Sequence, residues 1–223
     1  MQGKLQQAFE KYLDELFFWN TKYNLTSIKD REEAISKHFL DSLTLDKAFD
    51  FSSKNYNIID VGSGAGFPGL VIKIAYPNLR MVLLDSVKKK ILFLKHIISV
   101  LNIKGAEAVW ERSEDYAKEH REEFDVVLAR ALAPLNIALE LCLPLLKVGG
   151  TFLAMKGNKA FEEIDKSKNA LKELGGEIEK IVQTSISCPK EGQIIRNIVV
   201  VKKISSTPKN FPRKSGFAKK HPL

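Results

Sequence analysis

The sequence predicts an α/β fold with a mostly parallel, Rossmann-like seven-stranded sheet that ends in an antiparallel hairpin. Short apolar segments alternate with segments of helical length or spacing, which is typical of parallel sheets. The first apolar segment runs into a glycine-rich stretch, and the second ends in Asp85. Helix-rich sequence comes first, so we expect an N-terminal helical extension (1–50), a main domain (51–203) and a basic C-terminal tail (204–223).

The elements are expected in the following order. A core-facing N-terminal helix is predicted by an apolar stripe at helical spacing, formed by Leu5, Phe9, Tyr12, Leu13 and Leu16. Parallel strands are predicted at 57–61, 80–84, 106–110, 124–129 and 150–155. Helices are predicted at 69–75, 88–101, 115–121, 134–146 and 158–174. Segments 177–184 and 194–203, joined by the loop 189–192, predict the terminal hairpin.

The glycine-rich segment 60–69, DVGSGAGFPG, predicts a pocket for a nucleoside cofactor. Gly62 and Gly64 let the backbone approach a ligand closely, and Asp85 can accept hydrogen bonds from both ribose hydroxyls. This spacing suits NAD as well as S-adenosylmethionine. Asp60 favours S-adenosylmethionine, because a carboxylate repels a pyrophosphate and attracts a sulfonium and an ammonium. Pro68 also lacks the N–H that a phosphate would use.

Composition limits the class of protein. The 223 residues, 44% of them hydrophobic, suffice for one core with a small appendage. The sequence contains no apolar run long enough to span a bilayer and does not begin like a secretory signal, so we expect a cytoplasmic protein without membrane contact. Cys142 and Cys188 are far apart and lack metal-ligand spacing, so neither a disulfide framework nor a metal site is expected.

The net charge of +8 is concentrated near the C-terminus. Without the last seven cations of the tail region, the remaining net charge is about +1. These cations are Lys202, Lys203, Lys209, Arg213, Lys214, Lys219 and Lys220. Phe211 and Phe217 lie among them, a mixture suited to phosphate contact and base stacking. Composition alone also permits a solvated, disordered end.

The predicted arrangement resembles the class I S-adenosylmethionine-dependent methyltransferase fold, in which ligands collect at the carboxyl ends of the strands. Arg130 ends the fourth strand, where its cation can bind a phosphate, a base carbonyl or the cofactor carboxylate. That strand end lacks the Asp/Asn-Pro-Pro-aromatic motif of enzymes that methylate exocyclic amines, and no cysteine follows a proline as carbon-5 chemistry requires. A ring nitrogen such as guanine N7 needs no general base, so we assign no catalytic residue.

Two upstream motifs leave their roles open. His38 and Asp41 lie three residues apart on one helical face, and a structural pair that caps or bridges helices is the favoured interpretation. The segments 19–20 and 23–26 combine aromatic and amide groups, which could pack over the pocket or contact a base.

These motifs occur together and in order in one family. The chain resembles RsmG (formerly GidB) from Trp19 to Leu223. The matching motifs are Trp19-Asn20, Asn24-Leu-Thr26, His38-x-x-Asp41-Ser-Leu43, the glycine-rich segment 60–69, Leu84-Asp-Ser86, Arg112-Ser-Glu-Asp115 and Met155-Lys-Gly157. The resemblance implies methylation of guanine N7 in bacterial 16S ribosomal RNA, at guanine 527 in conventional RNA numbering. It also implies a partner, the 16S RNA or the small ribosomal subunit, and we expect the protein to act as a monomer.

The resemblance assigns roles to individual residues. Gly62 and Phe67 are implied to contact the cofactor in the first loop, Ser113 and Glu114 to contact its adenine side, and Arg130 to complete the set. Ser113 stands where alanine is frequent in the family, so a backbone contact would survive but a side-chain role is in doubt.

The resemblance also favours an RNA-binding role for the basic tail over the solvated, disordered end that composition alone permits. Arg213, Lys214, Lys219 and Lys220 become candidate RNA contacts. Replacing Lys219 and Lys220 with Ala is therefore expected to weaken RNA binding and to leave cofactor affinity intact.

Two competing classes remain open at this point. A nicotinamide-dependent oxidoreductase could use the same glycine loop, although no Tyr-Lys or His catalytic arrangement is evident and Asp60 opposes it. A catalytically idle RNA-binding protein could have retained the fold. Binding of NAD without binding of S-adenosylmethionine would indicate the oxidoreductase. Binding of S-adenosylmethionine without turnover on a ribosomal substrate would indicate the idle RNA-binding protein.

Overall fold

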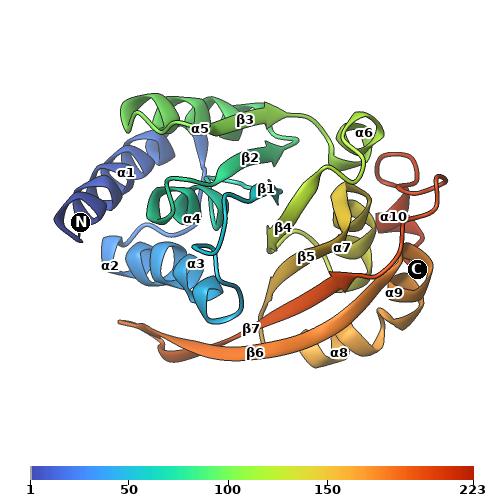
Figure 1. The fold of residues 1–223 in the computed structure, drawn as a ribbon. Coiled ribbons are helices and arrows are strands. Elements are labelled where there is room, and N and C mark those ends of the chain that lie inside the picture. The colour runs from blue at the N-terminus through green and yellow to red at the C-terminus, as the bar shows by residue number, and fades with distance from the viewer. Residues whose placement is uncertain (1) are drawn as a thin grey trace.

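Seven strands form one sheet in the order β3-β2-β1-β4-β5-β7-β6 in the computed structural model, which describes residues 2–223 (Figure 1). The sheet is parallel except for β7, which runs antiparallel to β5 and β6. The strands are β1 (Asn57–Val61), β2 (Arg80–Asp85), β3 (Ala106–Trp110), β4 (Phe124–Arg130), β5 (Leu146–Lys156), β6 (Gly176–Cys188) and β7 (Gly192–Lys203). The predicted α/β class and its terminal hairpin are confirmed.

The helices flank the sheet on both faces. Before β1 lie α1 (Gln2–Tyr23), α2 (Arg31–Ala34), the π-helical turn η1 (Ile35–Leu40), α3 (Asp41–Leu43) and the 3₁₀ turn η2 (Thr44–Lys47). Between β1 and β5 lie α4 (Gly69–Ala75), α5 (Lys88–Val100), α6 (Ser113–Glu119), α7 (Leu135–Cys142) and the 3₁₀ turn η3 (Leu143–Leu145). After β5 come α8 (Ala160–Asp165), α9 (Lys168–Leu174) and α10 (Phe217–Lys220). No helix among these residues is long and apolar enough to cross a membrane.

Two predicted helices differ from the observed ones. The segment 158–174 forms two helices, α8 and α9, because the buried Ser167 donates a hydrogen bond from its Oγ to the Glu163 carbonyl at 2.6 Å and the chain turns there. The bend lets Ala160 and Ala170 both face the core. The segment 134–146 stops being α-helical at Cys142, and β5 starts at Leu146.

Alternate residues of the central strands enter two separate cores, as the period of two in a strand requires. Ile58 packs with the layer formed by α1, α4 and α5, whereas its neighbour Ile59 packs with the layer formed by α6, α7 and α9. Val126 and Val127 of β4 divide in the same way. The result is a helix–sheet–helix arrangement with the strand ends of β1, β2 and β4 held between the layers (Figure 1).

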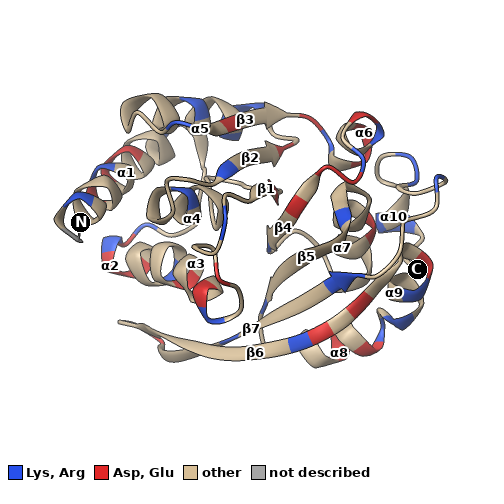
Figure 2. Ribbon diagram, in the orientation of Figure 1, with Lys and Arg blue, Asp and Glu red and all other residues tan. Residues whose placement is uncertain are grey.

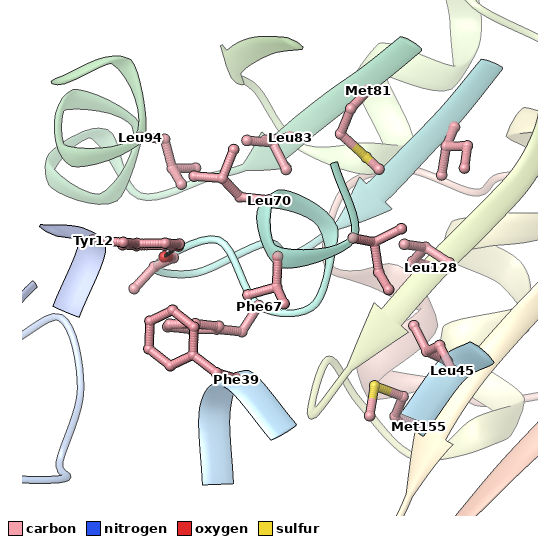
Figure 3. Close-up of a cluster of buried hydrophobic side chains, with 14 of the residues drawn as sticks. Tyr12, Phe39, Leu45, Phe67, Leu70, Met81, Leu83, Leu94, Leu128 and Met155 are labelled. Atoms are coloured by element: carbon pink, nitrogen blue, oxygen red, sulfur yellow. Dashed lines mark hydrogen bonds between the residues drawn. The ribbon is translucent and has the colours of Figure 1, made fainter. Parts of the chain in front are cut away.

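Helix α1 supports the glycine-rich loop. The Tyr12 side chain is fully buried, and its ring stacks on Phe67 with centroids 5.4 Å apart and an interplanar angle of 4°. Its hydroxyl donates a hydrogen bond to the Ala65 carbonyl. Figure 3 shows Tyr12, Phe67 and Phe39 gathered beside Leu70 of α4. The N-terminal helices therefore hold the loop in place as well as covering one face of the sheet.

The C-terminal segment 204–223 packs against the main domain. Arg121 donates hydrogen bonds to the carbonyls of Phe211 and Pro208 at 2.6 and 2.9 Å. The Arg213 guanidinium pairs with Glu140 of α7, whose side chain is 1% exposed. Figure 2 shows Lys and Arg spread over helices and strands and interspersed with Asp and Glu. Residues 204–223 thus form a structured segment, and the disordered end that composition permitted is not observed.

Candidate active site

A first cavity of about 710 Å³ lies at the carboxyl ends of β1, β2 and β4. This volume falls within the range of small-molecule sites. Its wall contains five of the residues that the sequence indicated for cofactor binding or RNA contact: Gly62, Asp85, Ser113, Glu114 and Lys219. A cavity thus lies at the edge of the sheet where the sequence placed these residues, and their binding roles stay predictions.

Asp85 is fixed in the wall of the first cavity by backbone donors. The Gly64 N–H donates to its Oδ2 at 2.9 Å, and the Val87 N–H donates to its Oδ1 at 2.8 Å. Each carboxylate oxygen can accept a second hydrogen bond. Lys90 Nζ also lies 3.4 Å from Oδ2. The side chain is therefore oriented before a ligand arrives. Its Oδ1 can accept one further donor, and a hydroxyl at Oδ2 would take the place of the long Lys90 contact.

Gly62 shapes the floor of the first cavity. Its φ of +73° lies in the left-handed region, which favours glycine, and a Cβ there would lie 2.7 Å from Leu132 Cδ1. Gly64 has a φ of +61° and presents its N–H to Asp85. The two glycines thus form a turn against which a ligand can lie in contact with the backbone.

Ser113 and Glu114 begin α6 at the opposite side of the first cavity. The Glu114 Oε1 accepts a hydrogen bond from the Gly216 N–H at 2.8 Å. Gly216, Ala218 and Lys219 accordingly complete this wall. The expected separation between pocket and tail does not hold, because the C-terminal segment is part of the cavity.

Asp60 and Phe67 lie beneath the loop. The Asp60 Oδ2 accepts a hydrogen bond from the Gly69 N–H at 2.8 Å at the start of α4, and its Oδ1 is buried without a hydrogen-bond partner among residues 2–223. Burial raises the pKa of Asp60 to about 7. Phe67 is sandwiched between the rings of Tyr12 and His38. Direct cofactor contacts of Asp60 and Phe67 stay predictions.

A second cavity of about 510 Å³ adjoins the first. The two cavities share Ala131, Ala133 and Pro134 in their walls. Arg130 lines the second cavity, where its Nη1 donates to the Lys37 carbonyl at 2.7 Å and to Asp41 Oδ2 at 3.2 Å. The predicted contact of Arg130 with the cofactor therefore stays a prediction.

His38 connects Arg130 to the upstream motifs. Burial, together with the charge of Arg130, lowers the pKa of His38 to about 3, so the ring is neutral near pH 7. Its Nδ1 lies 3.2 Å from Arg130 Nη2, which can only donate, so Nδ1 accepts and Nε2 carries the proton. Nε2 then donates to Thr26 Oγ1 at 2.8 Å. The Asn20 amide in turn binds the Thr26 N–H and carbonyl at 2.9 and 3.0 Å.

The predicted RNA contacts differ in their surroundings. Arg213 is held by Glu140, with Nε at 2.9 Å from Oε1 and a second contact from Nη2 to Oε2. Lys214 and Lys220 are exposed, and Lys219 is exposed at the edge of the first cavity. A role in RNA binding stays a prediction for all four.

The residues of the first cavity fit a nucleoside ligand. Asp85 can accept a further donor at Oδ1, Gly62 presents bare backbone to the cavity, and Ile137 and Leu141 supply an apolar wall. Asp60 does not line this cavity, and its Oδ1 is buried without a hydrogen-bond partner within residues 2–223. The start of α4 offers few amides to a phosphate of a dinucleotide. Pro68 has no N–H, and the N–H groups of Gly69 and Leu70 are bound to Asp60 and to the Gly66 carbonyl.

The strand order and the position of the first cavity define the class of protein. The fold is that of class I S-adenosylmethionine-dependent methyltransferases. The chain is similar to the crystal structure of M. jannaschii TYW2 in complex with AdoMet, with a TM-score of 0.57 and 15% identity over 74% of this chain and 77% of that one. Precorrin-6y C5,15-methyltransferase from Geobacter metallireducens gives a TM-score of 0.56 and 16% identity over 82% of this chain and 100% of that one.

The chain belongs to the GidB family, described as rRNA small subunit methyltransferase G, whose model matches residues 5–195. The ribosomal RNA small subunit methyltransferase G of Halalkalibacterium halodurans is 47% identical over 100% of this chain and 92% of that protein. The enzyme of the same name from Acetivibrio thermocellus is 46% identical over 96% of this chain and 87% of that protein. The predicted family is confirmed.

Proposed function

We propose that this protein transfers a methyl group from S-adenosylmethionine to N7 of a guanine in bacterial 16S ribosomal RNA. Membership of the family supports methylation of small-subunit ribosomal RNA with this cofactor. Guanine N7 as the acceptor atom, and guanine 527 in conventional numbering, are the finer parts of the proposal.

The observation that carries the choice of a ring nitrogen is the wall between the two cavities. Among residues 2–223, those common to both are Ala131, Ala133 and Pro134, and none of these has a titratable side chain. N7 of guanine has a free lone pair and no proton to remove, so its attack needs no general base. An acceptor that must lose a proton would call for a base at this position.

The residues of the first cavity take binding roles in this proposal. Asp85 accepts the ribose hydroxyls, Gly62 and Gly64 give the cofactor close access to backbone, and Ser113 and Glu114 lie at its adenine side. The cofactor supplies an activated methyl group. The protein contributes alignment of the acceptor with that group, which raises the rate by proximity and orientation.

Partners and location complete the proposal. The macromolecular partner is the 16S RNA or the small subunit, Lys214, Lys219 and Lys220 are available for RNA contact, and the protein acts as a cytoplasmic monomer.

Transfer of labelled methyl from S-adenosylmethionine tests the proposal. Small subunits that lack native N7 methylation, naked 16S RNA and large subunits should be compared in parallel, with NAD and S-adenosylmethionine titrated separately. We expect label on the small-subunit RNA and binding of S-adenosylmethionine alone. NAD binding in its place would favour the oxidoreductase, and cofactor binding without turnover on any RNA would favour the idle RNA-binding protein.

A further inference from the structure

Two arginines share one buried carboxylate in the second cavity. Arg130 Nη1 lies 3.2 Å from Asp41 Oδ2, and Arg196 Nε lies 3.0 Å from Asp41 Oδ1. The Asp41 side chain is only 3% exposed, whereas Arg196 keeps 23% of its side chain exposed. At Asp41, two guanidiniums thus share one carboxylate.

The other cations of the second cavity are balanced. Lys37 is paired with Glu33 at 2.8 Å and also with Glu191. Lys156 is paired with Glu163 at 2.8 Å. Because Lys37 has two carboxylate partners, the four cations and the four carboxylates of this cluster balance overall. What distinguishes Arg130 and Arg196 is that two guanidiniums share a single carboxylate.

Arg196 also has unused hydrogen-bond donors. Its Nε is bound to Asp41 and its Nη1 contacts the Ile195 carbonyl at 3.4 Å. Within residues 2–223, its Nη2 has no hydrogen-bond partner. A planar guanidinium with free N–H groups at a cavity wall is suited to bind the oxygens of a phosphate.

A chain of partly buried hydrogen bonds holds Arg130 and Asp41 in position. Asn20 holds Thr26, Thr26 holds His38, and His38 accepts from Arg130. Arg130 and Asp41 then connect to Arg196 of β7. The upstream motifs whose roles the sequence left open thus form one network behind the second cavity.

We propose that the second cavity binds a backbone phosphate of the RNA strand that carries the target base, with Arg196 as its main contact. Asn20, Thr26, His38 and Asp41 are positioning residues for the two guanidiniums. The inference rests on the proposed function, because it assigns the acceptor strand to the cavity beside the cofactor. The target base then lies toward the wall shared with the first cavity.

An RNA phosphate fits this cavity better than the carboxylate of the cofactor. The first cavity alone, at about 710 Å³, is large enough for the whole cofactor. Arg196 lines only the second cavity, whose wall also contains the apolar Ile28 and Met155 that can contact a ribose or base. A site with unused guanidinium donors and an apolar wall is suited to a nucleotide unit of RNA.

The test compares Arg196→Gln with Lys180→Gln. Lys180 is an exposed residue of the neighbouring strand β6, so its replacement removes the same charge outside both cavities. Asp41 keeps Arg130 as a partner in Arg196→Gln, which protects the fold. Affinity for a 16S RNA fragment at several salt concentrations, affinity for S-adenosylhomocysteine, and kcat and KM for methyl transfer should be measured.

We expect Arg196→Gln to weaken RNA binding roughly tenfold and to reduce the salt slope by about one, with KM raised more than kcat is lowered. Affinity for S-adenosylhomocysteine should not change, and Arg196→Lys should restore the salt slope but only part of the affinity. Lys180→Gln should behave like the wild type.

Three results would overturn the inference. Equal RNA affinity and salt slope in Arg196→Gln and Lys180→Gln, with methyl transfer intact, would remove the phosphate site and leave the proposed function standing. A loss of S-adenosylhomocysteine affinity in Arg196→Gln would assign the cavity to the cofactor carboxylate. Failure of the wild type to bind or methylate any RNA would reject the proposed function and the inference together.

Discussion

Asp60 and Asp85 end neighbouring parallel strands, yet their surroundings differ. Asp85 stands in the wall of the first cavity and is oriented by the N–H groups of Gly64 and Val87. Asp60 is fully buried, accepts a hydrogen bond from the Gly69 N–H and, in the described part of the chain, has no partner for its Oδ1. We therefore assign ligand contact to Asp85 and support of the loop to Asp60.

Asp85→Ala should weaken cofactor binding about 10- to 100-fold, because hydrogen bonds to a charged acceptor are lost. Calorimetric titration with S-adenosylhomocysteine measures the change. Asp125→Ala is the matched control. Asp125 also accepts a hydrogen bond from a backbone N–H, that of Asn57, but it lies at the start of β4, whereas the first cavity lies at the carboxyl ends of the strands. Equal losses in both variants would contradict the assignment.

Asp60→Asn should change how stability depends on pH. The folded pKa of Asp60 is raised to about 7, above the usual value of about 3.9, so its stabilising contribution is complete below pH 4 and is lost as pH rises to about 7. The free energy of unfolding of Asp60→Asn, relative to the wild type, should therefore increase across this range. Urea unfolding at pH 4.5, 6 and 8 measures it.

His38 changes the dependence of stability on pH in the opposite direction over part of the same pH range. Its folded pKa is lowered to about 3, so its contribution is present above pH 6.5 and is lost as pH falls. The wild-type profile contains both effects, which is why the difference between Asp60→Asn and the wild type is the quantity to follow. A difference that stays constant with pH would contradict the burial argument for Asp60.

At the scale of elements, the glycine-rich loop depends on space as well as backbone conformation. Gly62→Ala should lower cofactor affinity and stability, because its φ is +73° and the new Cβ would meet Leu132 Cδ1 at 2.7 Å. Gly149→Ala is the control, with a φ of +81° but no atom within 4 Å of the added Cβ. We expect a loss of about 1 kcal/mol in the control and a larger one in Gly62→Ala, as measured by urea unfolding.

The Gly62→Ala and Gly149→Ala variants should also differ in their affinity for the ligand. S-adenosylhomocysteine affinity should fall in Gly62→Ala and stay at the wild-type value in Gly149→Ala. An equal affinity in both would mean that the Gly62 turn does not contact the cofactor.

The C-terminal segment is the second element that shapes the first cavity. Gly216, Ala218 and Lys219 line it, and the Gly216 N–H is bound to Glu114. Deletion of residues 217–223 should therefore lower S-adenosylhomocysteine affinity, while Arg213 and its partner Glu140 keep the preceding residues in place. Lys220→Ala, which changes an exposed neighbour, should leave the affinity unchanged. Unchanged affinity in the deletion variant would contradict the role of this segment.

At the scale of the whole molecule, the features that could be predicted from the sequence are those that depend on short stretches of it. The strand positions and the glycine-rich turn were recovered because apolar alternation and glycine placement specify them within a few residues. The path of residues 204–223 could not be predicted, because it depends on contacts with α6 and α7, which are far away in the sequence. One local signal existed: Glu140 is the only charged residue of α7 and its side chain is buried, which requires a cation such as Arg213.

The second cavity likewise could not be predicted from local sequence pattern. Asp41 and Arg196 are 155 residues apart, and their pairing follows from the position of β7 between β5 and the edge strand β6. The sequence placed Arg130 at the correct strand end but left open which ligand it serves. That choice depends on which way the side chain turns, and it turns toward Lys37, His38 and Asp41.

The central claim is that two adjoining cavities align a guanine N7 of 16S RNA with the methyl donor. Mapping the methylated base most directly tests it, by chemical cleavage at 7-methylguanosine after reaction with small subunits that lack the modification. We predict cleavage at a single guanine, appearing only when enzyme and S-adenosylmethionine are both present. Label on another atom or base, or no modification despite cofactor binding, would contradict the account.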